Sequence, residues 1–227
     1  MLSPALRLVC AFICLLGAST FLPAETPASD IWRVDNLKTI AGAPVKLWGN
    51  PTLASEASAA AIRFDGKSDG VIVPLVPVAN WKSFTIEMLF SPEADGGEEQ
   101  RFLHIQDAQG RRILLELRTL PDAHWCLDTF LYSDSGHRLA LMDRARAHPA
   151  GRWYWVALTY DAGRMTHFVN AVKECEGDIL FEPMSETGRT SLGVRQNKVS
   201  WFKGAIREVR FTPAALPAEK LQRISAE

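Results

Sequence analysis

The 227-residue chain lacks an excess of either charge. It has 25 Lys and Arg side chains against 26 Asp and Glu, which gives a formal net charge of −1. Such a balance provides no electrostatic argument for binding nucleic acid or an anionic membrane surface. The sequence also contains a single long apolar run, which excludes a polytopic membrane protein. A hydrophobic content of 47% nevertheless indicates a folded chain rather than a disordered one.

The apolar run lies near the N-terminus, at residues 8–16, after a start that carries one positive charge at Arg7. Small residues follow, among them Ala24. A basic start, a short apolar middle and a small-residue end predict a secretory signal peptide over residues 1–24. Because the run is shorter than the roughly 20 residues of a membrane span, we expect a secreted or periplasmic/extracellular protein with no membrane span after cleavage.

The position of cleavage has two interpretations. Cleavage after Ala24 is the first choice, but Leu22 at the −3 position is not small, so a cut near Ala18 or Ser19 stays open. Residues 25–31 would form a short polar leader, and residues 32–227 a single domain, since no linker or second composition regime interrupts them.

Cysteines are scarce, and signal cleavage would make them scarcer. Cys10 and Cys14 would leave with the signal peptide, so the mature chain would keep Cys126 and Cys175. Two cysteines in an oxidising compartment favour a disulfide between them. Two separate buried thiols are the alternative. The absence of a C-x-x-C pair leaves no zinc signature.

After residue 31 the apolar side chains alternate with polar ones, a period of two that is typical of β-strands. Residues 83–90 place Phe84, Ile86, Met88 and Phe90 on one face. Residues 112–118, 125–132 and 155–160 alternate in the same way. The alternation predicts half-buried strands, with one face of each toward a core.

Turn chemistry separates these strands. Residues 107–110, 133–136 and 161–163 each combine Asp or Ser with Gly, as hairpin connections do. One segment, residues 217–224, has a helical pattern with Pro217 in its first turn. Many short strands without βαβ alternation predict an all-β, two-sheet antiparallel sandwich that ends in a short C-terminal helix.

Four segments, in order, resemble the concanavalin A-like lectin/glucanase superfamily and its LamG-type jelly-roll domain. They are Phe64-Asp-Gly through Val73-Pro, Phe84-Thr-Ile-Glu, Gly151-Arg-Trp through Tyr160-Asp, and Phe202-Lys-Gly through Val209-Arg-Phe. The resemblance covers residues 32–224 and implies a jelly-roll fold. It does not imply one activity, because this fold hosts lectins, matrix-binding modules and hydrolases.

Many relatives of this kind hold a structural calcium ion, and an aspartate in the last long strand is commonly one of its ligands. Arg207 stands at that position here, and a cation is unfavourable beside Ca²⁺. The resemblance therefore implies no cofactor and disfavours calcium at that site. Asp65 and Asp69 stay open as ligands of a different metal site.

A catalytic site would need paired carboxylates. Laminarinase-type hydrolases of this fold carry an E-x-D-x-x-E strand, which the sequence lacks. The nearest substitute is a set on the polar faces of three strands, Glu87, Glu116 and Asp128, with Arg118 and Trp155 on the same face if the strands are neighbours. A solvated sheet face with ordinary surface charges is the interpretation we favour for these residues, so we favour a protein that is not an enzyme over a hydrolase.

The chain contains seven tryptophans. Trp125 and Trp153 are expected to pack structurally. Trp155 and Trp201 are less constrained by the strand pattern, and each is a candidate for stacking on a sugar ring, with packing in the core or at its rim as the alternative. The loops at residues 95–100 and 195–200 are the candidates for carrying a ligand site.

Three functions follow in order of preference. The first is a secreted, non-catalytic, lectin-like module that binds carbohydrate or a cell-envelope or matrix polymer. The second is a structural or protein-interaction module of the same fold without a sugar site. The third is a glycoside hydrolase that uses Glu87, Glu116 and Asp128. The candidate ligand-binding residues are Glu87, Glu116, Arg118, Asp128, Trp155 and Trp201.

Overall fold

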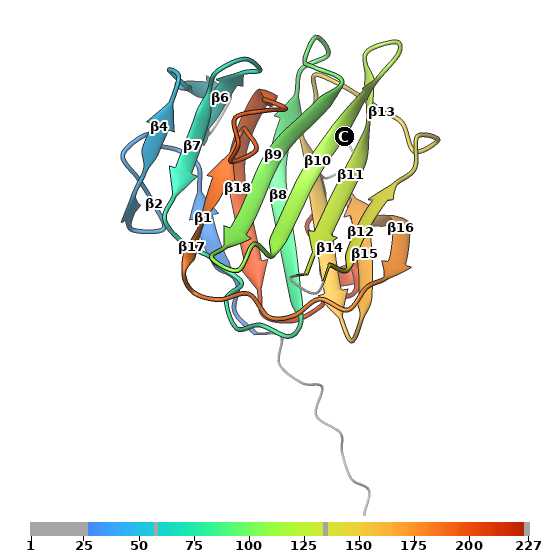
Figure 1. The fold of residues 1–227 in the computed structure, drawn as a ribbon. Coiled ribbons are helices and arrows are strands. Elements are labelled where there is room, and N and C mark those ends of the chain that lie inside the picture. The colour runs from blue at the N-terminus through green and yellow to red at the C-terminus, as the bar shows by residue number, and fades with distance from the viewer. Residues whose placement is uncertain (1–26, 57–58, 134–135, 225–227) are drawn as a thin grey trace, which may run out of the picture.

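The computed structural model is a sandwich of two antiparallel sheets (Figure 1), and it describes residues 27–56, 59–133 and 136–224. The expected signal peptide, its cleavage position and the first residues of the expected leader lie outside these ranges. Strand β1 (Asp30–Arg33) begins within the last residues of that leader. The predicted all-β antiparallel sandwich is confirmed.

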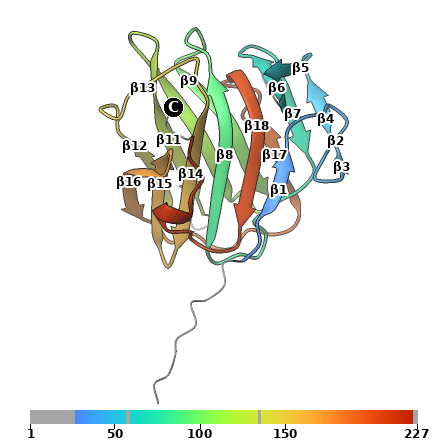
Figure 2. The ribbon, with the colours of Figure 1, turned by 180° about the vertical axis from the view of Figure 1, so that it is seen from behind.

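One layer, here called the β8 sheet, faces the viewer in Figure 2. In spatial order it contains β16 (Val172–Asp178), β15 (Arg164–Val169), β14 (Tyr154–Asp161), β8 (Phe84–Pro92), β18 (Lys203–Thr212), β6 (Ala59–Asp65) and β5 (Thr52–Glu56), and β1 also pairs with β18.

The other layer, here called the β10 sheet, faces the viewer in Figure 1. Its order is β12 (Arg138–Met142), β11 (His124–Tyr132), β10 (Arg112–Leu120), β9 (Glu99–Asp107), β17 (Gly188–Leu192), β7 (Gly70–Val73) and β4 (Lys46–Trp48), with β13 (His148–Pro149) on β11. A small separate hairpin joins β2 (Thr39–Ile40) and β3 (Ala43–Pro44).

The core lies between the inner faces of the two sheets, where the alternating pattern placed it. Phe90 of β8 stacks on Phe102 of β9 with ring centroids 4.4 Å apart, and the edge of Trp125 from β11 meets it at 5.2 Å. All three side chains are buried. Such aromatic contacts across the layers add to the stabilisation from buried apolar area, so the predicted inward role of Phe90 and Trp125 is confirmed.

One polar pair crosses the core. His167 of β15 is fully buried, and its Nδ1 lies 2.9 Å from Oγ1 of Thr129 on β11. Burial lowers the pKa of His167 to about 4, because a charged imidazole is costly away from water. This histidine is neutral at physiological pH and joins the two sheets by a hydrogen bond.

The last long strand, β18, contains an irregularity in its pairing. Ile206 and Val209 both face the core although they differ in parity, and the pairing of β18 with β8 shifts register between Ile206 and Glu208. A Cβ at Gly204 would lie 2.3 Å from the carbonyl oxygen of Ser91. The glycine therefore permits the close backbone approach of β18 to β8.

The predicted C-terminal helix is wrong. The segment forms only a single 3₁₀ turn, η1 (Ala218–Lys220), in an otherwise extended stretch. Its apolar residues Leu216 and Leu221 pack across the outer face of the β8 sheet instead of forming a helical stripe. No helix in the described part of the chain is long and apolar enough to cross a membrane.

The expected disulfide is also wrong, since Cys126 and Cys175 are both free thiols. Cys126 lies on β11 between Trp125 and Leu127, which face the core, so its side chain is on the outer face of the β10 sheet. Cys175 lies on β16 of the β8 sheet and packs against the core. The two side chains therefore lie on different sides of the β10 sheet, and a disulfide needs its two Cβ atoms about 4 Å apart.

Candidate functional site

The outer face of the β10 sheet carries a cleft of about 260 Å³. Its floor comes from β10 and β11, one wall from β9 and the loop between β17 and β18, and the other wall from β12. The lining residues are Arg101, Leu114, Glu116, Arg118, Asp128, Phe130, Ala140 and Arg195.

Strand register explains why these side chains meet. Glu116 pairs with Asp128 on β11 and, after a register shift in the pairing of β9 with β10, with Arg101 on β9. Leu114, two residues earlier on β10, pairs with Phe130. Residues two apart on a strand share a face, so the charged row and the apolar row lie side by side on the same outer surface.

The charged row is a network of ion pairs. Nε of Arg101 lies 2.5 Å from Oε1 of Glu116, and Nη2 of Arg118 lies 2.7 Å from Oδ2 of Asp128. Glu99, at the start of β9, contacts both arginines, at 3.2 Å from Arg101 through its Oε2. Arg101 also donates to the hydroxyl of Ser200 in the β17–β18 loop. The two arginines are therefore fixed by three carboxylates.

Burial dominates the electrostatics of the two inner carboxylates. Burial raises the pKa of Glu116 to about 7, although Arg101 opposes the rise. The pKa of Asp128 is also raised by burial, with Arg118 opposing it. Arg118 keeps its charge, because its pKa is raised by Asp128 and Glu99. At neutral pH the Glu116 carboxyl is therefore near the midpoint of its titration.

Two polar groups that line the cleft are not used by this network. Oδ1 of Asp128 is buried without a hydrogen-bond partner. Arg195 is half-buried, and within the described residues its guanidinium makes no ion pair or hydrogen bond. Leu114 and the half-buried Phe130 supply an apolar floor beside them. The cleft thus offers an acceptor, a charged donor and an apolar surface to a ligand.

The loop after β17 forms the wall that carries Arg195. The backbone N–H of Gln196 donates to Nδ1 of His104 on β9 at 3.0 Å, which fixes the loop to the sheet. Farther along, Lys198 lies 5.0 Å from the ring of Trp48, and Trp201 meets Trp48 edge-on at 6.4 Å. The candidate loop at residues 195–200 therefore borders the cleft.

Glu87 is not part of this cleft, so the expectation that the three acids line one face is wrong. Glu87 lies on β8, on the outer face of the other sheet, where the backbone N–H of Gln222 donates to its Oε1 at 2.6 Å. Glu116, Arg118 and Asp128 are brought together as expected. Strand parity assigns a residue to a face, but which strands are neighbours is decided by the whole sheet order.

The two candidate tryptophans lie apart from each other and from the cleft floor. Trp155 of β14 is 8% exposed on the outer face of the β8 sheet, where the guanidinium of Arg210 lies 5.3 Å from its ring. Trp201 is half-buried against Trp48 beside the loop that carries Arg195. Neither lines the cleft that contains Glu116 and Asp128.

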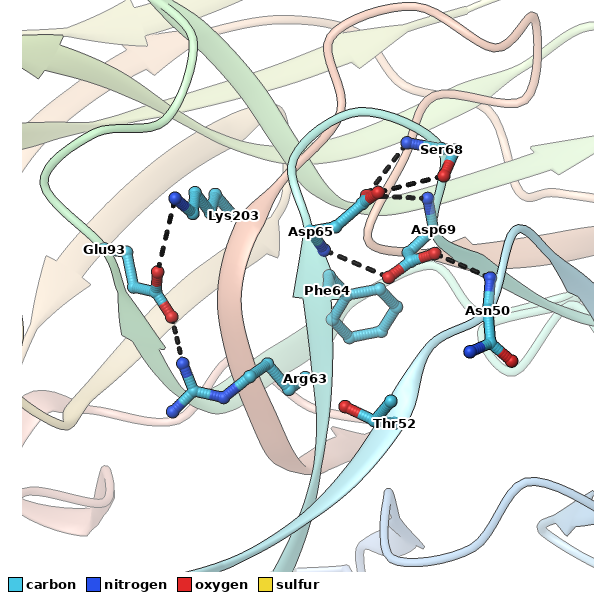
Figure 3. A pocket seen from close by; sticks show the side chains of 9 residues that line it. All are labelled: Asn50, Thr52, Arg63, Phe64, Asp65, Ser68, Asp69, Glu93 and Lys203. Carbon is cyan, nitrogen blue, oxygen red and sulfur yellow. Dashed lines mark hydrogen bonds and ion pairs between the residues drawn. The ribbon is translucent and has the colours of Figure 1, made fainter.

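A second pocket of about 350 Å³ lies at the turn between β6 and β7 (Figure 3). Its two aspartates are occupied by the backbone of the turn. Oδ1 of Asp65 accepts from the N–H groups of Lys67, Ser68 and Asp69, and these bonds lower its pKa to about 2 against the opposing effect of burial. Asp69 accepts from the N–H groups of Asn50 and Asp65. Both carboxylates stabilise the turn.

On the other side of the same pocket, Glu93 contacts both Lys203 and Arg63 (Figure 3). Arg207, which stands where relatives carry a calcium ligand, lies with its guanidinium 4.3 Å from the ring of Trp153. Among the described residues, no group of three or more His, Cys, Asp or Glu side chains is placed to hold a metal ion. The pocket at the turn between β6 and β7 is therefore lined by turn contacts and surface ion pairs, and the cleft on the β10 sheet is the better candidate site.

Comparison with known proteins places this geometry in a family. A profile of the concanavalin A-like lectin/glucanases superfamily matches residues 65–222. No curated protein matches the chain.

Solved structures show the same fold. Domain 4 of AbnA, a GH43 extracellular arabinanase from Geobacillus stearothermophilus solved in complex with arabinotriose, is 18% identical with a TM-score of 0.58, over 86% of this chain and 97% of that one. The botulinum neurotoxin serotype D ligand binding domain, solved in complex with N-acetylneuraminic acid, is 15% identical with a TM-score of 0.63, over 83% of this chain. This chain spans about half of that domain, at 48%.

Proposed function

The chain belongs to the concanavalin A-like lectin/glucanases superfamily, and we propose that it is an exported, non-catalytic module that binds carbohydrate in the cleft of the β10 sheet. The export signal expected over residues 1–24 is part of this proposal. It is tested by the N-terminal sequence of the protein recovered from the secreting cell, which should begin after Ala24 or near Ser19.

One observation carries the proposal. Among the described residues, the cleft combines an acceptor without a partner, Oδ1 of Asp128, with a guanidinium without a partner, that of Arg195, and both line the cleft together with the apolar Leu114 and Phe130. A sugar presents hydroxyl donors and acceptors around an apolar ring face, so it satisfies each of these groups at once. Polar groups that have no partner in the free protein are costly and are satisfied by a suitable ligand.

The structural neighbours support the same proposal. The arabinanase domain, which this chain matches over 97% of that domain, was solved with arabinotriose. The neurotoxin domain, of which this chain matches 48%, was solved with N-acetylneuraminic acid. Their low identities carry no residue correspondence to this chain. The choice of the cleft therefore depends on its own geometry.

The alternative of a glycoside hydrolase is weaker. It depended on Glu87 joining Glu116 and Asp128, and Glu87 lies on the other sheet. The two carboxylates that do share the cleft are each held by an arginine, at 2.5 Å for Glu116 and 2.7 Å for Asp128. A glycosidase needs one carboxyl free to give a proton and another free to attack or to activate water.

Affinity electrophoresis through gels that contain soluble polysaccharides tests the proposal. Arabinan, galactan, dextran, xylan and polygalacturonate cover neutral and acidic backbones. We expect retardation of the protein by at least one of them, and a loss of about five- to tenfold in affinity in Asp128→Asn and in Phe130→Ala, because each removes about 1 kcal/mol of contact.

Asp178→Asn is the matched control, because Asp178 lies on β16 with 76% of its side chain exposed. It should leave the retardation unchanged. Thermal melting checks that each variant is folded; if Asp128→Asn does not fold, Phe130→Ala decides alone, since Phe130 is only half-buried. The absence of retardation in every gel would overturn the proposal in favour of a structural or protein-interaction module. Retardation that survives in the folded variants would place the site elsewhere.

A further inference from the structure

The outer face of the β10 sheet holds more positive than negative charge. The carboxylates of the cleft, Glu99, Glu116 and Asp128, are all engaged by Arg101 and Arg118. Strand register and the loop contacts place further cations on the same face that form no ion pair with a carboxylate within the described residues. These are Arg112, Arg138, Arg189, Arg195 and Lys198.

These cations raise the electrostatic potential around Arg195, where several of them lie close together. Arg195 is held below its usual pKa, first by burial and then by repulsion from Arg101 and Arg112. His104, beneath the loop of Arg195, has its pKa lowered to about 3 by burial and by the same cations. An anion among these arginines relieves the repulsion, because it adds the opposite charge at the point where like charges meet.

From this arrangement, and resting on the proposed function, we propose that the ligand of the cleft is an acidic polysaccharide, whose carboxylate or sulfate groups are bound by Arg195 and Arg112. Guanidinium groups suit this role, since their planar N–H edges match oxyanions in pairs.

The geometry extends the site beyond one sugar. Arg112 is two residues from Leu114 on β10, and it pairs with Tyr132, whose ring lies 4.3 Å from its guanidinium. Phe130 and Tyr132 therefore form successive same-face positions on β11, roughly 7 Å apart along the strand. The buried Nε of Arg112 has no hydrogen-bond partner. Arg112 and Tyr132 thus lie on the same outer face, directly beyond the Leu114 and Phe130 floor of the cleft, so a chain of charged sugars that leaves the cleft along these strands meets Arg112 as well as Arg195.

The positive potential is local to this face. The whole chain carries a formal net charge of −1 and a sequence pI of about 6.5, so it has no general attraction for polyanions at neutral pH. Binding of an acidic polymer would therefore depend on this surface, and removing one of its free arginines would have a measurable effect.

The experiment compares polymers that differ in charge alone. Dextran and dextran sulfate share one backbone, and polygalacturonate differs from its methyl ester by the carboxylate charge. Titration calorimetry at low and high salt should show binding to at least one charged polymer at tenfold or more greater affinity than to its neutral counterpart. Dextran sulfate and polygalacturonate separate the sulfate from the carboxylate source. The affinity should fall as salt rises, because the contacts are ionic.

Arg195→Gln and Arg112→Gln are the test variants, and Arg164→Gln is the control, since Arg164 is half exposed on β15 of the other sheet. Each test variant should weaken binding to the charged polymer about tenfold, the loss of one charge-assisted hydrogen bond. Arg164→Gln should leave it unchanged. An equal loss in Arg164→Gln would show general charge attraction and overturn the inference.

The outcomes separate this inference from the proposed function. If neutral polymers bind as tightly as charged ones and Phe130→Ala weakens both, the cleft binds carbohydrate but the acidic class is wrong. If no polymer binds at all, both this inference and the proposed function are wrong. If a charged polymer binds and both arginine variants retain full affinity, the anion site is not at these residues.

Discussion

The buried carboxylates on the two outer faces of this sandwich have different partners. On the β8 sheet, Leu216 and Leu221 of the C-terminal segment pack on Ala157 and Phe168, and the backbone N–H of Gln222 donates to Glu87 beneath them. On the β10 sheet, Glu116 and Asp128 are paired with arginine side chains and line a cleft. The C-terminal segment of the chain covers the first face, and the second face carries the cleft proposed as the binding site.

This difference indicates that one outer face contributes to the stability of the fold, whereas the other is suited to binding. A carboxylate that is satisfied by a backbone N–H under apolar side chains contributes to the fold and is not accessible to a ligand. A carboxylate that pairs with an arginine from a neighbouring strand and lines a cleft, as Asp128 does, keeps an acceptor for a ligand that enters the cleft. Changes on the covered face should therefore act on stability, whereas changes on the open face should act on binding.

The covered face allows a prediction about the free energy of unfolding. Leu216→Ala and Leu221→Ala each remove an apolar side chain that is less than a tenth exposed. Each should lower the free energy of unfolding by about 2 kcal/mol, through lost burial and the cavity that remains. Urea denaturation measures the change. Binding to the polysaccharide should be unchanged in either variant.

The matched control for this pair is Ile224→Ala. Ile224 belongs to the same segment but is 40% exposed, so its loss should change the stability by less than about 0.5 kcal/mol. If the leucine variants are as stable as the parent protein and bind less polymer, the C-terminal segment belongs to the binding site. In that case the contrast between the two faces is wrong.

The sequence predicts which segments form strands far better than it predicts which strands are neighbours in a sheet. Alternation placed Ile86, Leu115 and Leu158 toward the core, and all are fully buried, because the period of two is a local property of a strand. The alternating pattern did not show that Glu87 and Glu116 lie in different sheets. Their strands lie in different sheets, and sheet order depends on pairings between distant segments that no local pattern records.

The site was predicted in part for the same reason. Glu116, Arg118 and Asp128 lie on β10 and β11, which a short turn joins, so their common face followed from the hairpin. Arg101 was missed because the register shift between Leu115 and Glu116 displaces its pairing by one residue. Arg195 lies in a candidate loop, but it is far from β10 in the sequence, so no local pattern predicted that it would line the same cleft.

Titration sharpens the comparison at Glu116. Burial raises the pKa of Glu116 to about 7, from its ordinary value of 4.5. Between these pH values the folded protein holds a proton that the unfolded chain releases, so the free energy of unfolding falls as pH rises through this window. The loss reaches about 3 kcal/mol in total, at about 1.4 kcal/mol per pH unit. Urea denaturation from pH 4.5 to 7.5 should show that Glu116→Gln lacks this decline.

Glu87→Gln provides the comparison on the covered face. Its pKa is also raised by burial, but the N–H of Gln222 and the charge of Arg210 oppose the rise. Glu87→Gln should therefore remove a smaller pH-dependent decline than Glu116→Gln, because its carboxylate is stabilised by its own chain. An identical pH dependence in the parent protein and in Glu116→Gln would show that the Glu116 carboxylate is as well stabilised as the one on the covered face.

The smallest expected effect concerns the thiols, one on each sheet. Cys126 lies on the outer face of the β10 sheet and Cys175 packs against the core from the β8 sheet, so a reductant should leave the melting temperature unchanged. A disulfide that closed this loop would stabilise the fold by roughly 4 kcal/mol. Burial raises the pKa of both thiols and keeps them protonated at neutral pH. Alkylation of the unfolded protein without reductant should modify both cysteines, as mass spectrometry would show. Modification that requires a reductant would mean that the two faces are linked covalently and are not independent.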